Sequence, residues 1–128
     1  MGYYSFVQGE LKVIANKKKL DNDLLEVFDK EFEEGITQLI SHVDYSTTDD
    51  GADSATVGVS CEGKLYAINE DILSIVSLLV EKYDATVNGR LYVSGEDAGD
   101  LWRINVVDNK VTSEEARILF SDGSVFGE

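Results

Sequence analysis

The chain has 128 residues, 43% of them hydrophobic, which is enough for one domain that buries its own core. Asp and Glu number 25 against 11 Lys and Arg, so the net charge is −14. A field of this sign repels nucleic acid and anionic membranes and attracts basic protein surfaces.

The first third of the chain predicts a strand, a helix and a second strand. Residues 3–14 are rich in aromatic and β-branched side chains, and Gly9 is consistent with a β-bulge in this strand. Asp23 is a good helix N-cap, with Glu26 at the capping-box position, and Gly35 is expected to end the helix. Its apolar face is Leu24, Leu25, Phe28, Phe32 and Ile36. Residues 36–47 fit either more helix or a strand, and we favour a strand near 40–47.

The remaining two thirds predict one helix among strands. Residues 55–61 alternate like a strand, and Glu62-Gly63 fits a two-residue hairpin turn into residues 64–67. The apolar stripe of the second helix, with Asn69 as N-cap, is Ile72, Ile75, Val76, Leu79 and Tyr83. The last three strands are expected at about 87–94, 101–107 and 110–120, with a turn at Asp108-Asn109. This order predicts an α+β fold, with a mostly antiparallel sheet of about five to seven strands and two helices on one face.

Strand alternation assigns the side chains of residues 101–107 to two faces. Trp102, Ile104 and Val106 share one face, and we expect that face to lie in the core.

Nothing in the chain indicates export or membrane insertion. No apolar stretch approaches the roughly 18 residues that span a bilayer, and the longest, residues 72–80, is interrupted by Ser74 and Ser77. The opening Met-Gly-Tyr-Tyr-Ser-Phe has no basic region followed by an apolar one, unlike a signal peptide. A single cysteine, Cys61, excludes an internal disulfide and suits a reducing compartment. We expect one domain over residues 1–128, located in the cytoplasm.

No catalytic constellation stands out. His42 and Cys61 are too few for a zinc site, and no motif surrounds them that would support a Cys–His catalytic pair. With 25 acids, a pair of carboxylates at a suitable spacing carries no information. We expect no catalytic residue, no metal and no cofactor, and therefore a protein that is not an enzyme.

Two acidic turns support an alternative function. Carboxylates cluster around Gly51 and again around Gly95 and Gly99, but neither cluster has the spacing of a calcium-binding loop. Asp and Gly favour turns on their own account. The alternative hypothesis is an accessory protein that binds a small ligand or calcium through these turns without catalysis.

The charge is unevenly distributed along the chain. Residues 1–20 have a net charge of +3, whereas residues 21–62 carry twelve acids against Lys30 alone, a net charge of −11. The carboxylates gather on one predicted helix face and in the two acidic turns. The expected partner-binding residues are Glu26, Asp29, Glu33, Glu34, Asp49, Asp50, Asp53, Glu96, Asp97 and Asp100.

Both ends of the chain carry short motifs that resemble a family. The segments are Gly2-Tyr3-Tyr4, Gly9-Glu10, Gly89-Arg90-Leu91, residues 95–103 with Asp100-Leu101-Trp102-Arg103, and Ser121-Asp122-Gly123. They resemble a family of small uncharacterised proteins from bacteriophages and actinobacteria, a domain of unknown function. Its members often have proline where this chain has residues 17–19 and Ser121. The resemblance implies an α+β domain and a phage origin, and it supplies no catalytic residues.

The acidity predicts a function in binding. Ordered carboxylates can imitate a phosphate backbone and occupy a channel lined with Lys and Arg. The leading hypothesis is a DNA-mimicking inhibitor, phage-encoded, that blocks a nucleic-acid-processing or host-defence enzyme, of the anti-CRISPR or anti-restriction type. Its partner would be a basic protein surface, with no direct contact to nucleic acid or membrane, acting in the host cytoplasm as a monomer or homodimer. The competing explanation is that acidity only keeps the protein in solution.

Overall fold

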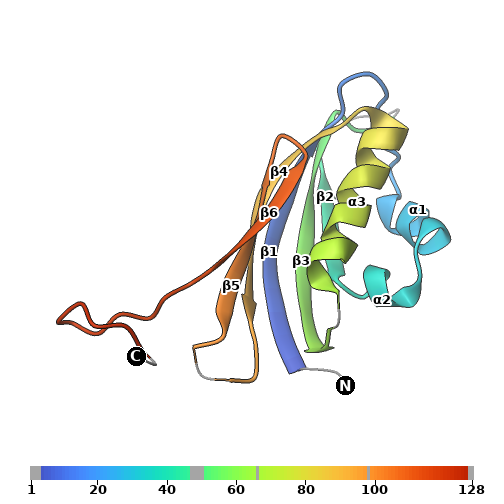
Figure 1. Ribbon diagram of the computed structural model, residues 1–128. Coiled ribbons are helices and arrows are strands. Elements are labelled where there is room, and N and C mark those ends of the chain that lie inside the picture. The colour runs from blue at the N-terminus through green and yellow to red at the C-terminus, as the bar shows by residue number, and fades with distance from the viewer. Residues whose placement is uncertain (1–3, 47–50, 66, 98, 127–128) are drawn as a thin grey trace.

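The computed structural model describes residues 4–46, 51–65, 67–97 and 99–126 of the chain (Figure 1). Within them, six strands form one antiparallel sheet: β1 (Tyr4–Ile14), β2 (Ile40–Tyr45), β3 (Ser54–Lys64), β4 (Thr86–Ser94), β5 (Leu101–Val107) and β6 (Lys110–Glu115). Their order across the sheet is β2-β3-β1-β4-β5-β6. The α+β class and the antiparallel sheet predicted from sequence are confirmed.

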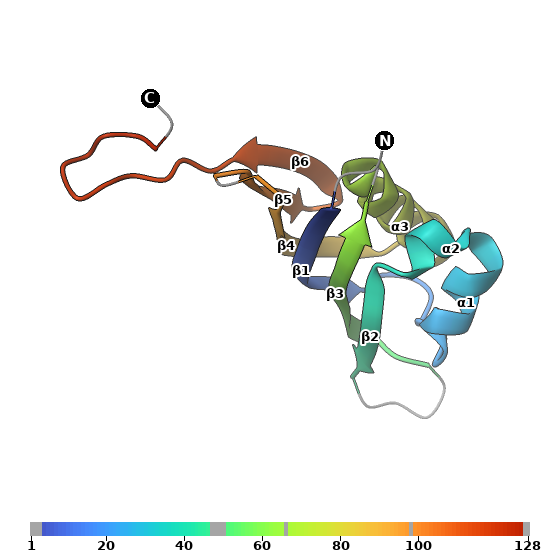
Figure 2. The same cartoon turned by 90° about the horizontal axis from the view of Figure 1, so that it is seen from below.

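Helices cover only one face of this sheet. They are α1 (Leu24–Glu31), α2 (Glu34–Thr37) and α3 (Ile68–Tyr83), and Figure 2 shows all three on the same side. Two helices were expected, and the short α2 is an additional one within the described residues. The predicted end of the first helix at Gly35 is wrong, because Phe32 adopts an extended conformation that ends α1 at Glu31, and Gly35 lies inside α2. None of these helices is long and apolar enough to cross a membrane.

The core lies between α3 and the sheet. All five residues of the predicted α3 stripe are buried, and they pack in one cluster with strand residues such as Val7, Leu11 and Leu91. In β5 the predicted face assignment is confirmed, because Ile104 and Val106 are fully buried and Trp102 packs against the same core. Among the residues that the structure describes, none forms a helix on the opposite face of the sheet (Figure 1).

Strand β1 is central and pairs along its whole length. Its pairing with β3 runs from Tyr4–Lys64 to Ile14–Ser54 without interruption. The predicted hairpin turn at Glu62-Gly63 is therefore wrong: β3 continues through it, because the long ladder with β1 outweighs a local turn preference. The helix that follows begins at Ile68 after Ala67, so the predicted N-cap at Asn69 is wrong as well.

Three other strand predictions are corrected. The pairing of β1 with β3 and β4 shows no shift at Gly9, so the expected bulge is absent there. The irregularity lies in β2, between Ile40 and His42. The ambiguous residues 36–47 divide into the end of α2 and β2, and β6 ends at Glu115 instead of continuing to residue 120.

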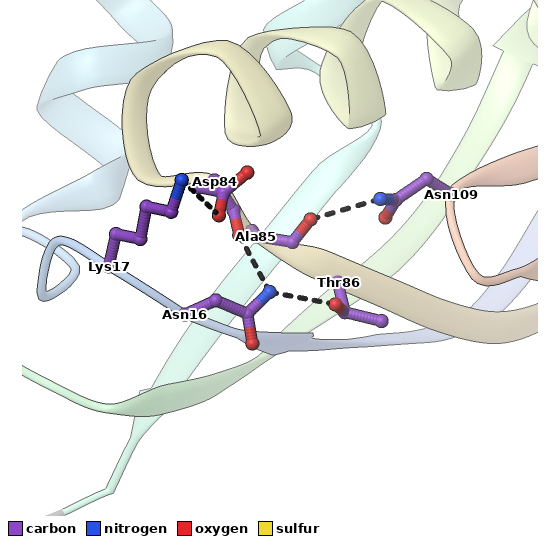
Figure 3. A network of polar contacts seen from close by, with 6 residues as sticks. All are labelled: Asn16, Lys17, Asp84, Ala85, Thr86 and Asn109. Atoms are coloured by element: carbon purple, nitrogen blue, oxygen red, sulfur yellow. Dashed lines mark hydrogen bonds and ion pairs between the residues drawn. The ribbon is translucent and has the colours of Figure 1, made fainter.

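A polar network fixes the turn between α3 and β4 (Figure 3). The amide of Asn16 donates to the backbone oxygen of Asp84 at 2.7 Å and to the hydroxyl of Thr86 at 2.8 Å. From the β5–β6 turn, the amide of Asn109 donates to the backbone oxygen of Ala85 at 3.0 Å, while its oxygen accepts from the N–H of Val87. The segment after β1, the turn between α3 and β4, and the β5–β6 turn are thereby held together at one end of the sheet. The predicted turn at Asp108-Asn109 is confirmed, with positive φ at both residues.

Gly9 allows β1 and β4 to approach closely. Its φ is +152°, and a Cβ atom there would overlap the backbone oxygen of Arg90 and the side chain of Leu91. We expect Gly9→Ala to lower the free energy of unfolding by about 3 kcal/mol, through overpacking and backbone strain. Chemical denaturation followed by circular dichroism measures this.

Gly35 provides the matched control, since nothing lies within 4 Å of a Cβ built there. Gly35 lies in α2, so Gly35→Ala should leave stability unchanged or raise it by about 0.5–1 kcal/mol. Equal effects of the two substitutions would contradict the packing described for Gly9.

Candidate functional site

The most concentrated charge in the structure surrounds α1 and α2. Seven carboxylates occupy this region, all exposed, with Lys30 as the one cation between residues 21 and 34. We call them the acidic helix surface: Asp21, Asp23, Glu26, Asp29, Glu31, Glu33 and Glu34. The amphipathic sequence of α1 explains their exposure, since Leu24 and Phe28 on its other side are buried.

Part of the acidic helix surface is engaged in structural contacts. Asp23 caps α1 by accepting from the N–H of Glu26 at 3.1 Å, as predicted. Glu26 pairs with Lys30 at 3.1 Å, and Glu31 pairs with Lys82 of α3 at 3.7 Å.

The other carboxylates are available to a partner. Within the described part of the chain, the side chains of Asp29, Glu33 and Glu34 form no ion pair or hydrogen bond. A partner with basic side chains could therefore engage them without breaking an existing contact.

Asp21 connects this surface to the core. Its carboxylate accepts a hydrogen bond of 2.5 Å from the hydroxyl of Tyr83, whose ring is buried at the end of α3. Burial and the Asp21 carboxylate raise the pKa of Tyr83 well above its usual range. Burial likewise raises the pKa of Tyr45, whose hydroxyl oxygen accepts from the N–H of Leu24. The two tyrosines thus hold the start of α1 against the rest of the fold.

The acidic turn before β3 lies only partly within the described residues. Asp49 and Asp50 fall outside them. Asp53 is exposed and pairs with Lys19 at 3.9 Å, and backbone hydrogen bonds join Ala52 to Leu20. Because Leu20 immediately precedes the acidic helix surface, Asp53 lies beside the segment that leads into it.

The second acidic turn lies elsewhere. Glu96, Asp97 and Asp100 belong to the β4–β5 connection, on the other half of the sheet from β2 and α1 (Figure 1). Glu96 accepts a hydrogen bond from the backbone N–H of Tyr4 at 3.0 Å, so it also tethers the start of β1. The structure therefore brings Glu26, Asp29, Glu33 and Glu34 together and separates them from this turn.

The residues considered for metal or nucleophilic chemistry do not converge. No group of three or more His, Cys, Asp or Glu side chains in the described ranges is arranged to hold a metal ion. His42 lies over Gly58 on the helix-free face, where it contacts Ser41 and Asp44. Cys61 packs towards the core on the other face, and burial raises the pKa of its thiol, which disfavours the reactive thiolate.

The helix-free face of the sheet has a different electrostatic character. Strand alternation and pairing assign charges of both signs to this open sheet face. Its cations are Lys12, Lys64, Arg90, Arg103 and Lys110, and its acids are Glu10, Asp44, Glu62 and Glu114. On a chain with a net charge of −14, this face is close to neutral.

An apolar groove lies on the open sheet face. It has a volume of about 510 Å³, and its floor includes Phe6, Tyr92 and Leu101, with Arg103 and Glu114 at the side. Arg103 and Asn105 both donate to the Glu114 carboxylate, and these hydrogen bonds lower the pKa of Glu114. The groove is thus bordered by the ionised Glu114 carboxylate, whose negative charge is balanced by the neighbouring Arg103.

Sequence reasoning did not identify this groove. The signal was present in strand alternation: Phe6 of β1, Tyr92 of β4 and Leu101 of β5 all occupy the outward register. Because the pairing of β1 with β4 skips α1 to α3, the sequence did not indicate that these positions are neighbours.

Comparisons with family models, with curated proteins and with solved structures each gave no match to this chain.

The link between Tyr83 and Asp21 should contribute to stability. Tyr83→Phe removes a hydrogen bond to a charged acceptor, so the free energy of unfolding should fall by about 2 kcal/mol at neutral pH. Because the pKa of Tyr83 is raised, the folded chain keeps its phenol proton above about pH 10, where the unfolded chain releases it. Native stability should therefore decline as pH rises above about 10, and decline less steeply in Tyr83→Phe.

Urea unfolding at a series of pH values between neutral and strongly alkaline measures both effects. Tyr4→Phe is the control, because it removes the same kind of hydrogen bond, from Tyr4 to the Glu62 carboxylate, at an exposed position. It should lose much less stability than Tyr83→Phe, and an equal loss in both variants would argue against a special role for Tyr83.

Proposed function

We propose that this protein is a non-catalytic inhibitor that binds a basic protein surface through its acidic helix surface. The supporting observation is the segregation of charge: seven exposed carboxylates surround α1 and α2, while the open sheet face is close to neutral. A charge excess present only for solubility would not need to avoid one face.

The chemistry favours a partner that normally binds nucleic acid. Lys and Arg side chains arranged for phosphates bind carboxylates for the same electrostatic reason. Asp29, Glu33 and Glu34 need not break an existing pair to do so. The inhibitor would act by contact, occupying the channel of a nucleic-acid-processing or host-defence enzyme as a mimic of DNA. Such a partner and the single cysteine of the chain support a location in the cytoplasm, which would be the host cytoplasm for a phage-encoded protein.

Charge reversal on the acidic helix surface tests this proposal. Asp29→Lys/Glu33→Lys should weaken partner binding by about a hundredfold, assuming about 1.5 kcal/mol for each lost charge pair. Affinity capture from the native host followed by mass spectrometry identifies the partner, and titration of nucleic acid against the captured enzyme measures inhibition. Binding should also weaken as salt is raised.

The matched control is Glu70→Lys/Glu115→Lys. It makes the same change in net charge at exposed positions near β6, on the opposite edge of the sheet from α1. It should capture the same partner as the native chain. If both variants lose the partner equally, net charge and not the acidic helix surface is responsible, and the proposal fails.

A further inference from the structure

Beyond β6 the chain leaves the sheet as an arm. Residues 116–126 run away from the body of the molecule (Figures 1 and 2). The arm turns back on itself through backbone hydrogen bonds: Phe120 donates to Ser124 at 2.8 Å, and Phe126 donates to Ile118 at 2.7 Å. The Asp122 carboxylate accepts from both the N–H and the hydroxyl of Ser124, which closes the turn. The arm therefore has a shape of its own without support from a core.

The arm exposes apolar side chains that a globular chain normally buries. Leu119 is 60% exposed and Phe120 is 55% exposed, and the rings of Phe120 and Phe126 lie 6.3 Å apart. The described residues include eleven large hydrophobic side chains that are exposed. Nine of them belong to the arm or the open sheet face, and the other two are Leu25 and Leu73. This concentration is typical of an interaction surface.

The root of the arm directs its tip away from its own groove. Ala116 borders the groove and donates its N–H to the backbone oxygen of Leu101 at 2.9 Å. Ile118 and Phe126 lie against Gly99, on the β4–β5 connection. The arm is thus anchored at the edge of the groove while Leu119 and Phe120 are carried outward.

The charge distribution allows a second copy to occupy the groove. Two chains of charge −14 repel each other across most of their surface. The open sheet face, with five cations and four acids, is the region where like charges do not oppose contact. The net charge of the arm is also close to zero, because it contains one cation, Arg117, and one acid, Asp122.

We propose that the chain forms a two-fold symmetric homodimer in which the arm of each copy lies in the groove of the other. Leu119 and Phe120 of one copy cover Phe6, Tyr92 and Leu101 of its partner. Two-fold symmetry makes this contact twice, so both arms and both grooves are buried together. A stable interface of standard size covers about 800 Å² per copy, so it needs the arm and the open sheet face of each copy together and not the arm tip alone.

The dimer is independent of the proposed function because it uses a different surface. The acidic helix surface lies on the helix-covered side, and arm exchange on the open sheet face leaves it exposed in both copies. Failure of one proposal therefore leaves the other standing.

Sedimentation velocity of the full chain tests the dimer. We expect the native chain to sediment as a dimer at micromolar concentrations, and added salt should not dissociate it because apolar contacts hold it together. Leu119→Ser/Phe120→Ser should sediment as a monomer with an unchanged circular dichroism spectrum. Leu25→Ser/Leu73→Ser, which removes the two exposed apolar side chains outside this region, should remain dimeric. A monomeric native chain, or a dimer that survives loss of Leu119 and Phe120, would overturn the proposal.

Disulfide trapping distinguishes arm exchange from simple stacking of the two sheet faces. In a Cys61→Ser background, Leu119→Cys chains mixed with Tyr92→Cys chains should form a covalent pair under mild oxidation. Leu119→Cys chains mixed with Leu73→Cys chains should not. If the two mixtures cross-link equally, or neither does, the arm does not occupy the groove of the partner.

Discussion

Packing of α3 against one face of the sheet is the interaction on which the rest of the structure depends. The helix connects β3 to β4, the two neighbours of β1, and therefore crosses over the central strand. Its buried stripe meets Val7, Leu11 and Leu91 on that side. Every second strand residue is consequently in the core, and the residues between them form a face with no cover. The groove, the balanced charges and the root of the arm all belong to that second face.

The same layering separates the charges. Helices α1 and α2 join the covered side at the β2 edge, and their polar faces turn outward with seven carboxylates. At physiological salt, charges interact over about 8 Å, so carboxylates on neighbouring turns repel each other, whereas those on opposite faces do not. The capping bond of Asp23, the ion pairs of Glu26 and Glu31, and the bond from Tyr83 to Asp21 offset part of that repulsion. In the described part of the chain, no ion pair or hydrogen bond offsets the repulsion among the carboxylates of Asp29, Glu33 and Glu34. A cationic partner would relieve that repulsion on binding.

The two proposals assign different surfaces to different partners. A basic protein would meet the acidic helix surface, and a second copy would meet the open sheet face. If both hold, the dimer presents two acidic surfaces, and a target with two basic sites would be bound more tightly than by either alone. Salt separates the two contacts physically, because it screens the first and has little effect on the second.

The sequence by itself determined what local chemistry controls: the buried stripe of α3, the cap at Asp23, the turn at Asp108-Asn109, the faces of β5 and the acidic character of α1. Only the tertiary structure decided which strands are neighbours. That pairing explains why Glu62-Gly63 is part of β3 and not a turn, why Gly9 is needed for the close approach of β1 and β4, and why Glu96 lies far from Glu33. Periodicity shows which side of a strand is apolar, but pairing depends on contacts between residues far apart in the chain. The groove illustrates this, because it forms only where the pairing of β1 with β4 and of β4 with β5 brings Phe6, Tyr92 and Leu101 together.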